Sequence, residues 1–231
     1  MNYLVKLFLA FVLTSCSNLP VGGCPDGEIE WIHAVKIKDV KYEHHFPEPH
    51  DMVELNIVQG DEIGKVGYKM ADDACSNYKM KNGDATYLDE GTPIYSIKDT
   101  PTSLAVLAND QVFVVEQNTK AKTVGEYYPI KDLVKKIHIE STLDGRRLRT
   151  FPDASTKVFL DEWLALSLHD REQLAKDNKD DGESIFLEIE LKNGITFRET
   201  YWRDNKTFHV GAVGTERLAE TIEKEYSLIH K

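Results

Sequence analysis

The chain has 231 residues, of which 41% are hydrophobic, and its formal net charge is −11. This length suits one domain or two small ones, and the apolar content is sufficient for a real core. The acidic balance argues against nucleic acid as a partner, because binding to nucleic acid depends on Lys and Arg side chains that neutralise phosphates. It also argues against the domain lying flat on anionic lipid.

The N-terminus has the layout of an export signal. One basic residue, Lys6, precedes the uncharged run 7–13, and small residues then lead to Cys16. The uncharged run is too short to cross a bilayer, for which about 20 apolar residues are needed. The tetrad Leu13-Thr14-Ser15-Cys16 resembles the lipobox of bacterial lipoprotein precursors.

The lipobox resemblance implies that residues 1–15 are a cleaved signal peptide and that Cys16 carries the lipid, such as palmitate chains. Two acyl chains anchor a protein stably to a membrane. We therefore expect a lipoprotein on the extracytoplasmic face of the cell membrane, with residues 16–27 as a Gly- and Pro-rich tether. The alternative is an ordinary signal peptide with an incidental cysteine.

Two cysteines remain once Cys16 is assigned to lipid, namely Cys24 and Cys75. Disulfides form and persist outside the cytoplasm, and the remaining count is even. We expect a Cys24–Cys75 disulfide that ties the start of the domain to a later loop. The alternative is a pair of free thiols.

Residues 28–142 are expected to form a β-rich half. Apolar residues alternate with polar ones over 29–37 and 52–58, which predicts strands with one buried face. The pair Asn109-Asp110 between two apolar runs predicts a hairpin turn, and 133–139 predicts a further strand.

A turn that begins at Leu143 is expected to separate the β-rich half from a helix–hairpin–helix half over 143–231, with both halves in one compact unit. Apolar residues at helical spacing predict one helix over about 153–176 and a second over about 215–229. The predicted fold class is therefore α+β, with a mostly antiparallel sheet of short strands and two helices.

The hairpin between the two predicted helices has a register that can be derived. A three-residue loop at 192–194 pairs Leu191 with Ile195 and Ile189 with Phe197. This choice keeps apolar residues opposite apolar residues, as a sheet with one buried face requires. It also places Gly194 at the left-handed position of a type I turn followed by a bulge.

The middle of the chain contains three runs of note, Asn-Gly-Asp-Ala-Thr-Tyr-Leu at 82–88, Gly-Thr-Pro-Ile-Tyr-Ser-Ile at 91–97 and the apolar alternation at 134–139. With these runs the chain resembles a set of small uncharacterised lipoproteins of Gram-positive, spore-forming bacteria. The resemblance covers most of residues 30–230 and departs at 99–103, where Asp-Thr-Pro-Thr-Ser stands in place of a glycine–aromatic turn. The resemblance implies a lipid anchor and the fold, and it carries over no catalytic residue.

Few residues suggest chemistry. His44, His45 and His50 lie near carboxylates in a proline-containing loop and are weak candidates for a divalent metal site. Neighbouring His44 and His45 would point in opposite directions in an extended chain, so a solvated polar loop is the favoured interpretation. Glu188 and Glu190 share the polar face of a predicted strand, and we expect that face to be solvated.

The expected function is that of a binding or accessory module. The sequence has neither a Gly-x-Ser-x-Gly nucleophile motif nor a phosphate-binding loop. We expect no enzymatic activity, no cofactor and no nucleic acid, and a partner that is an envelope protein or peptide. Trp202 is a candidate for contact with that partner. The alternatives are metal capture by the histidine loop and a cell-wall hydrolase without a recognised motif.

Overall fold

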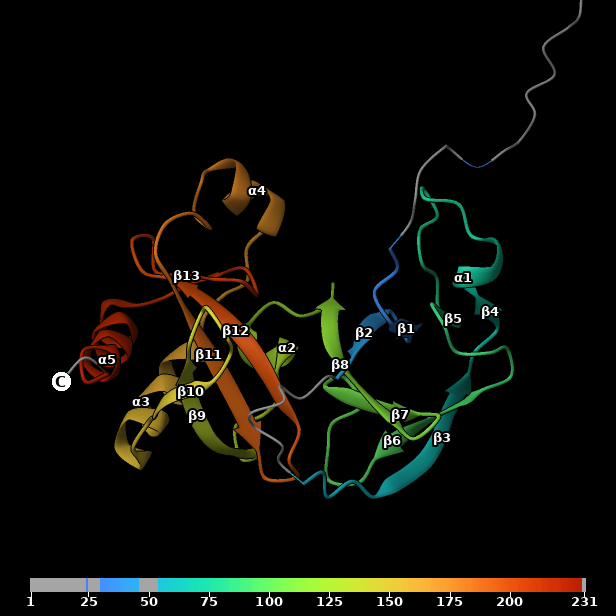
Figure 1. The fold of residues 1–231 in the computed structure, drawn as a ribbon, viewed down its shortest axis with the longest axis horizontal. Helices are drawn as coiled ribbons and strands as arrows, with labels where there is room; N and C mark the ends of the chain where they lie inside the picture. Colours follow the sequence, from blue (N-terminus) through green and yellow to red (C-terminus); the bar gives the residue numbers. More distant parts are fainter. Residues whose placement is uncertain (1–23, 25–29, 46–53, 230–231) are drawn as a thin grey trace, which may run out of the picture.

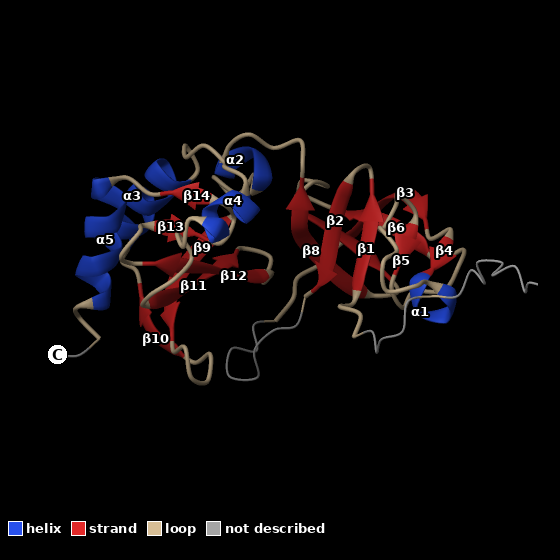
Figure 2. Cartoon of the chain, turned by 90° about the horizontal axis from the view of Figure 1, so that it is seen from above, coloured by secondary structure: helices blue, strands red, loops and turns tan. Residues whose placement is uncertain are grey.

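The molecule consists of two β-sheets that lie next to each other along its long axis (Figures 1 and 2). The computed structural model describes residue 24 and residues 30–45 and 54–229. Within these residues the chain forms an eight-stranded sheet and a six-stranded sheet, and helices pack mainly against the second. The predicted α+β fold with mostly antiparallel, short strands is therefore confirmed.

The first sheet has the strand order β3-β6-β7-β8-β2-β1-β5-β4. Its strands are antiparallel to their neighbours except for the short pair β4–β5, which is parallel. The bounds are β1 Ala34–Ile37, β2 Val40–His44, β3 Gln59–Lys65, β4 Tyr68–Lys69, β5 Asp84–Ala85, β6 Pro93–Ile97, β7 Ala105–Ala108 and β8 Gln111–Asn118.

The predicted hairpin turn at Asn109-Asp110 joins β7 to β8. Both residues have positive φ, 50° and 58°, as a two-residue turn that matches the twist of its strands requires. Beyond the turn, Val106 pairs with Phe113, and both side chains are fully buried. The turn thus sets the register of the central hairpin of this sheet.

The predicted disulfide between Cys24 and Cys75 is present, with the two Cα atoms 4.9 Å apart. Cys75 follows the short helix α1 (Met70–Asp73), which lies beside β4 at one edge of the first sheet. The bond therefore fixes the start of the described chain to that edge. Cys16, the signal residues 1–15 and the tether residues 17–23 and 25–27 lie outside the described residues.

The second sheet has the order β10-β9-β11-β12-β13-β14 and is antiparallel throughout. The predicted three-residue loop is confirmed, since Ile189 pairs with Phe197 and the Leu191 N–H donates to the Ile195 carbonyl. Gly194 has φ of 86°. The bounds are β9 Val134–Glu140, β10 Arg147–Thr150, β11 Ser184–Leu191, β12 Thr196–Trp202, β13 Thr207–Phe208 and β14 Ala212–Val213.

The prediction of one helix over 153–176 was wrong, because two helices occupy this range. Helix α3 (Asp153–Trp163) ends before an extended stretch, and α4 (Arg171–Lys176) begins after it. Within the stretch, Ser167 and Leu168 make β-bridges to other parts of the chain. Asp170 then starts a new helix, since its carboxylate accepts the N–H groups of Glu172 and Gln173.

The closing helix agrees with its prediction. Helix α5 (Glu216–Tyr226) begins after Thr215, whose hydroxyl oxygen accepts the Leu218 N–H. Leu218 and Ile222 are fully buried on its inner face. Helices α3 and α5 lie together against the second sheet, at the end of the molecule away from the first sheet (Figures 1 and 2).

The chain passes from one sheet to the other earlier than the expected boundary at residue 143. Strand β9 pairs with β11 and so belongs to the second sheet, and the turn after it lies within that sheet. The connection between the sheets is the segment 119–133, which contains the short helix α2 (Val124–Tyr127). Buried residues of both sheets belong to one hydrophobic cluster.

None of the helices in the described parts of the chain is long and apolar enough to cross a membrane.

Candidate functional site: the groove between the sheets

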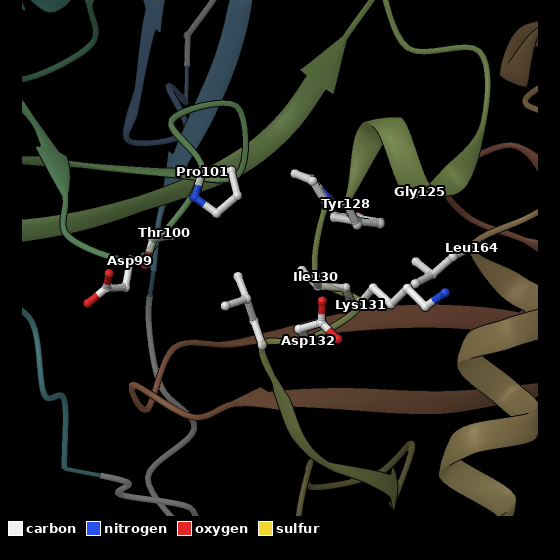
Figure 3. Close-up of a pocket in the computed structure, with 11 residues that line it drawn as sticks. Asp99, Thr100, Pro101, Gly125, Tyr128, Ile130, Lys131, Asp132 and Leu164 are labelled. Atoms are coloured by element: carbon white, nitrogen blue, oxygen red, sulfur yellow. The ribbon is translucent and has the colours of Figure 1, made fainter.

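A groove runs along the junction of the two sheets, and its larger hollow has a volume of about 690 Å³ (Figure 3). The floor is mainly apolar. Tyr128 and Ile130 are buried there, and Leu133 is half-buried. The walls come from three distant parts of the chain: the loop after β6, the connection between the sheets, and the end of α3. The residues that line it are Asp99, Thr100, Pro101, Gly125, Tyr128, Pro129, Ile130, Lys131, Asp132, Leu133 and Leu164.

Helix α2 positions one wall of this hollow. Its first N–H groups are satisfied by the segment after α3, since Val124 donates to the Leu166 carbonyl and Gly125 to the Leu164 carbonyl. The approach is close enough to require glycine, because a Cβ on Gly125 would lie 2.9 Å from the Leu164 oxygen. The wall is therefore held to α3 through the backbone.

Tyr128 closes the floor by stacking inside the core. Its ring lies 4.6 Å from the ring of Phe197 and 5.5 Å from that of Trp163, measured between centroids. Stacked rings in a close-packed interior hold one orientation. The floor of the larger hollow is therefore preformed.

A smaller hollow of about 250 Å³ continues the groove. It shares Asp99 and Leu133 with the larger one. Its other lining residues are Asn56, Val58, Lys98, Leu191, Lys192 and Asn193. At the junction the Asn193 amide donates to the Thr100 hydroxyl, which ties the hairpin of the second sheet to the first. The groove is thus elongated.

The charged groups at the rim of the larger hollow have no close ion-pair partners among the described residues. Among the described residues, neither the carboxylates of Asp99 and Asp132 nor the ammonium of Lys131 has an ion-pair partner within 4.0 Å. All three side chains belong to exposed residues. These groups therefore remain available to a ligand.

A third hollow, of about 270 Å³, lies elsewhere between the sheets and has a different character. Its charges are paired internally. Glu116 contacts both Lys41 and Arg171, and Arg198 contacts the buried carboxylate of Glu140. A hollow whose charges already neutralise each other is better described as an internal junction than as a ligand site.

The metal candidates His44 and His45 line this third hollow. The Thr196 N–H donates to Nε2 of His45, so the imidazole links the two sheets. Burial lowers the pKa of both histidines. The third candidate, His50, lies outside the described residues. Within the described residues no group of three or more His, Cys, Asp or Glu side chains is placed to hold a metal ion.

The expectation that Glu188 and Glu190 face solvent was wrong, since both are 4% exposed. The sequence pattern could not show their partner. Arg147 on β10 donates to both Glu188 oxygens, at 2.6 and 3.0 Å, and its guanidinium also lies 3.3 Å from Glu190. A buried carboxylate is tolerated when it is paired in this way. The polar face of the second sheet is therefore an ionic layer.

Within this ionic layer a hydroxyl, an imidazole and a carboxylate lie in line. Thr150 Oγ1 is 2.9 Å from Nδ1 of His138, and Nε2 of His138 is 3.1 Å from Glu190. A nucleophile and base in such contact can serve catalysis when oxyanion donors and a cleft accompany them. None of the three residues lines the hollows described above. The arrangement is explained by cross-strand pairing of His138 with Thr150.

Glu199 is a buried carboxyl that the sequence analysis missed. It lies on the apolar parity of β12 and is 1% exposed. Burial raises its pKa to about 8, although backbone N–H groups oppose the shift. The sequence did contain a signal for this burial. Glu199 occupies the same alternating positions as the apolar residues Phe197 and Tyr201.

Trp202 lies near His209, with ring centroids 6.2 Å apart. Both line a hollow of about 270 Å³ beside α4, away from the groove lining. The predicted contact residue is therefore not part of the groove.

Comparison of the chain with protein-family models, with curated proteins and with solved structures finds no match.

Proposed function

We propose that the chain is a membrane-anchored lipoprotein that binds a peptide segment, without catalysis, in the groove between its two sheets. The observation that carries the binding part is the larger hollow, with its volume of about 690 Å³, its apolar floor and the charged residues at its rim. Ligand sites commonly have about 300–1,000 Å³, a mainly apolar lining and a few polar groups that fix orientation.

The elongated form of the groove supports a peptide over a compact ligand. The two hollows meet at Asp99 and Leu133, and both are lined by apolar and polar residues. An extended chain advances about 3.3 Å per residue and presents side chains on alternate sides. A peptide therefore fits a long groove with separate apolar hollows.

Anchoring is supported by the tetrad Leu13-Thr14-Ser15-Cys16 and by the disulfide. Disulfides persist in oxidising surroundings outside the cytoplasm. Lipid on Cys16 would hold the domain on the extracytoplasmic face of the membrane, where envelope proteins and their fragments are accessible partners.

The anchor is tested by intact-mass measurement of the chain from membrane fractions, with Cys16→Ala as the comparison. The expected mature mass begins at Cys16 and includes a diacylglyceryl adduct, and Cys16→Ala should leave the membrane fraction without it. An unlipidated wild-type mass would refute anchoring.

The groove is tested by affinity selection from a defined library of tri- to hexapeptides, read by mass spectrometry. Leu133→Trp should fill the junction of the two hollows and abolish retention of peptides. Leu148→Trp makes the same change on β10 outside the groove lining and should retain them. Equal retention by both variants would contradict the groove as the site, and cleaved library members would contradict a non-enzymatic role.

A further inference from the structure

We infer that the groove takes short peptides with free ends, with the ligand's ammonium group at Asp99 and its carboxylate at Lys131. This inference rests on the proposed function and adds the class of peptide and its direction. It stands on the placement of charges of opposite sign at the two ends of the larger hollow (Figure 3).

The two ends are distinct in the structure. In Figure 3, Asp99 lies at one side of the hollow and Lys131 extends toward Leu164 at the other, with Asp132 between them. Asp99 comes from the loop after β6, whereas Lys131 comes from the connection between the sheets. A free peptide is itself a zwitterion, so its terminal charges complement this arrangement, and a reversed peptide would place like charges together.

The position of Asp99 is set by its backbone. Its φ is 57°, in the left-handed region that Asp and Asn tolerate better than other side chains. Lys98 lines only the smaller hollow, and the Lys192 ammonium already donates to the Asp132 carbonyl at 2.7 Å. Asp99 is therefore the charge that faces a ligand at this end of the larger hollow.

The volume of the larger hollow favours a ligand of only a few residues. A hollow of about 690 Å³ matches a short peptide better than a folded partner. Between the ends, the apolar floor of Tyr128, Ile130 and Leu133 suits an apolar side chain. Asp132, which has no ion-pair partner among the described residues, can accept an N–H from the ligand backbone.

The test uses one peptide, Leu-Phe-Leu, in four forms: with free ends, N-acetylated, C-amidated and with both ends blocked. Calorimetry on the wild-type protein should show that each blocked end weakens binding about two- to fivefold, as expected for loss of one exposed ion pair. In Asp99→Asn the N-acetyl effect should disappear while the amide effect remains. In Lys131→Gln the reverse should hold.

Matched controls remove the same charges outside the groove. Asp61→Asn and Lys79→Gln lie at exposed positions and should preserve both end effects. Equal affinity for all four peptide forms, with binding still lost in Leu133→Trp, would overturn the inference while the proposed function stands. If none of the four peptide forms binds the wild-type protein and the library selection retains no peptide, both the inference and the proposed function would be overturned.

Discussion

The carboxyl of Glu199 lies on the apolar face of the second sheet, where its Oε1 accepts the N–H groups of Thr200 and Val210, each at 3.1 Å. Its Oε2 has no hydrogen-bond partner among the described residues. Burial disfavours the charged form of a carboxyl and favours the protonated one. The raised pKa of about 8 follows from this, and Glu199 therefore holds a proton at neutral pH.

This raised pKa makes folding stability depend on pH. The pKa is about 8 in the folded chain against an ordinary value of 4.5. The stability that the proton supplies is thus complete below pH 4.5 and is lost as the pH rises toward 8. Glu199→Gln keeps the acceptor and removes the ionisation, so it should stabilise the fold by a few kcal/mol at pH 8 and little at pH 5.

The measurement is the midpoint of denaturant unfolding for wild type and Glu199→Gln between pH 5 and 8. The difference between the two should grow with pH. The exposed Glu220→Gln is the matched control and should give a small difference at every pH. If the difference in unfolding midpoint between wild type and Glu199→Gln stays constant from pH 5 to 8, the assignment of Glu199 as a buried, protonated carboxyl would be contradicted.

At the scale of elements, the ionic layer of the second sheet depends on strand β10. Arg147 is paired with Glu188 and Glu190, whose side chains are each 5% exposed. Removing one partner of a buried pair leaves an uncompensated charge that water cannot reach. The edge strand therefore contributes to the stability of strands deeper in the sheet.

Arg147→Ala should destabilise the fold by roughly 2–4 kcal/mol, at the lower end for a broken buried pair because the guanidinium is partly exposed. Arg146→Ala is the matched control. Its side chain is 65% exposed and pairs only with the exposed Asp144 among the described contacts, so its removal should change stability by less than about 0.5 kcal/mol. Equal unfolding midpoints in urea for the two variants would contradict a stabilising ionic layer.

Elements with a local cause were predictable from sequence. The loop at 192–194 follows from the apolar pattern and from Gly194, whose φ of 86° is a left-handed conformation that glycine adopts without strain. The interruption of the predicted helix at 164–170 was missed, although Asp170 followed by Gln173 is the pattern of a helix start. Apolar periodicity continued across the break and masked that signal.

Elements whose cause lies far away in the chain were not predictable. The alternation of apolar and polar residues in this strand predicted that Glu188 and Glu190 face solvent. Their burial depends instead on an arginine about 40 positions earlier in the chain. Likewise β9 pairs with β11 across the two helices α3 and α4, which no local pattern specifies. The groove combines residues near 100, 130 and 164, so its existence required the fold.

At the scale of the whole molecule, the chain is closed on itself by the Cys24–Cys75 bond, which spans 51 positions. A cross-link of this length restricts the unfolded chain and should stabilise the fold by about 4 kcal/mol. Reductant should therefore lower the unfolding midpoint of the wild-type protein. The midpoint of Cys75→Ser should equal this lowered value and should not change when reductant is added. A reductant-insensitive wild-type midpoint would contradict the stabilising role of the disulfide.

The two sheets are fastened to each other by polar contacts. His45 accepts the Thr196 N–H, and the Asn193 amide donates to Thr100. Together with the shared core they hold the walls of the groove at a fixed separation. A preformed groove lowers the ordering that a ligand must impose on the protein.

The central claim is that the groove between the sheets is the binding site, and backbone NMR shifts on titration with Leu-Phe-Leu test it most directly. The account predicts that the largest shifts fall at Asp99, Gly125 and Leu133. Residues around Trp202 and Arg171, which line a separate hollow beside α4, should be unaffected. Shifts concentrated at that hollow, or none at saturating peptide, would contradict the claim.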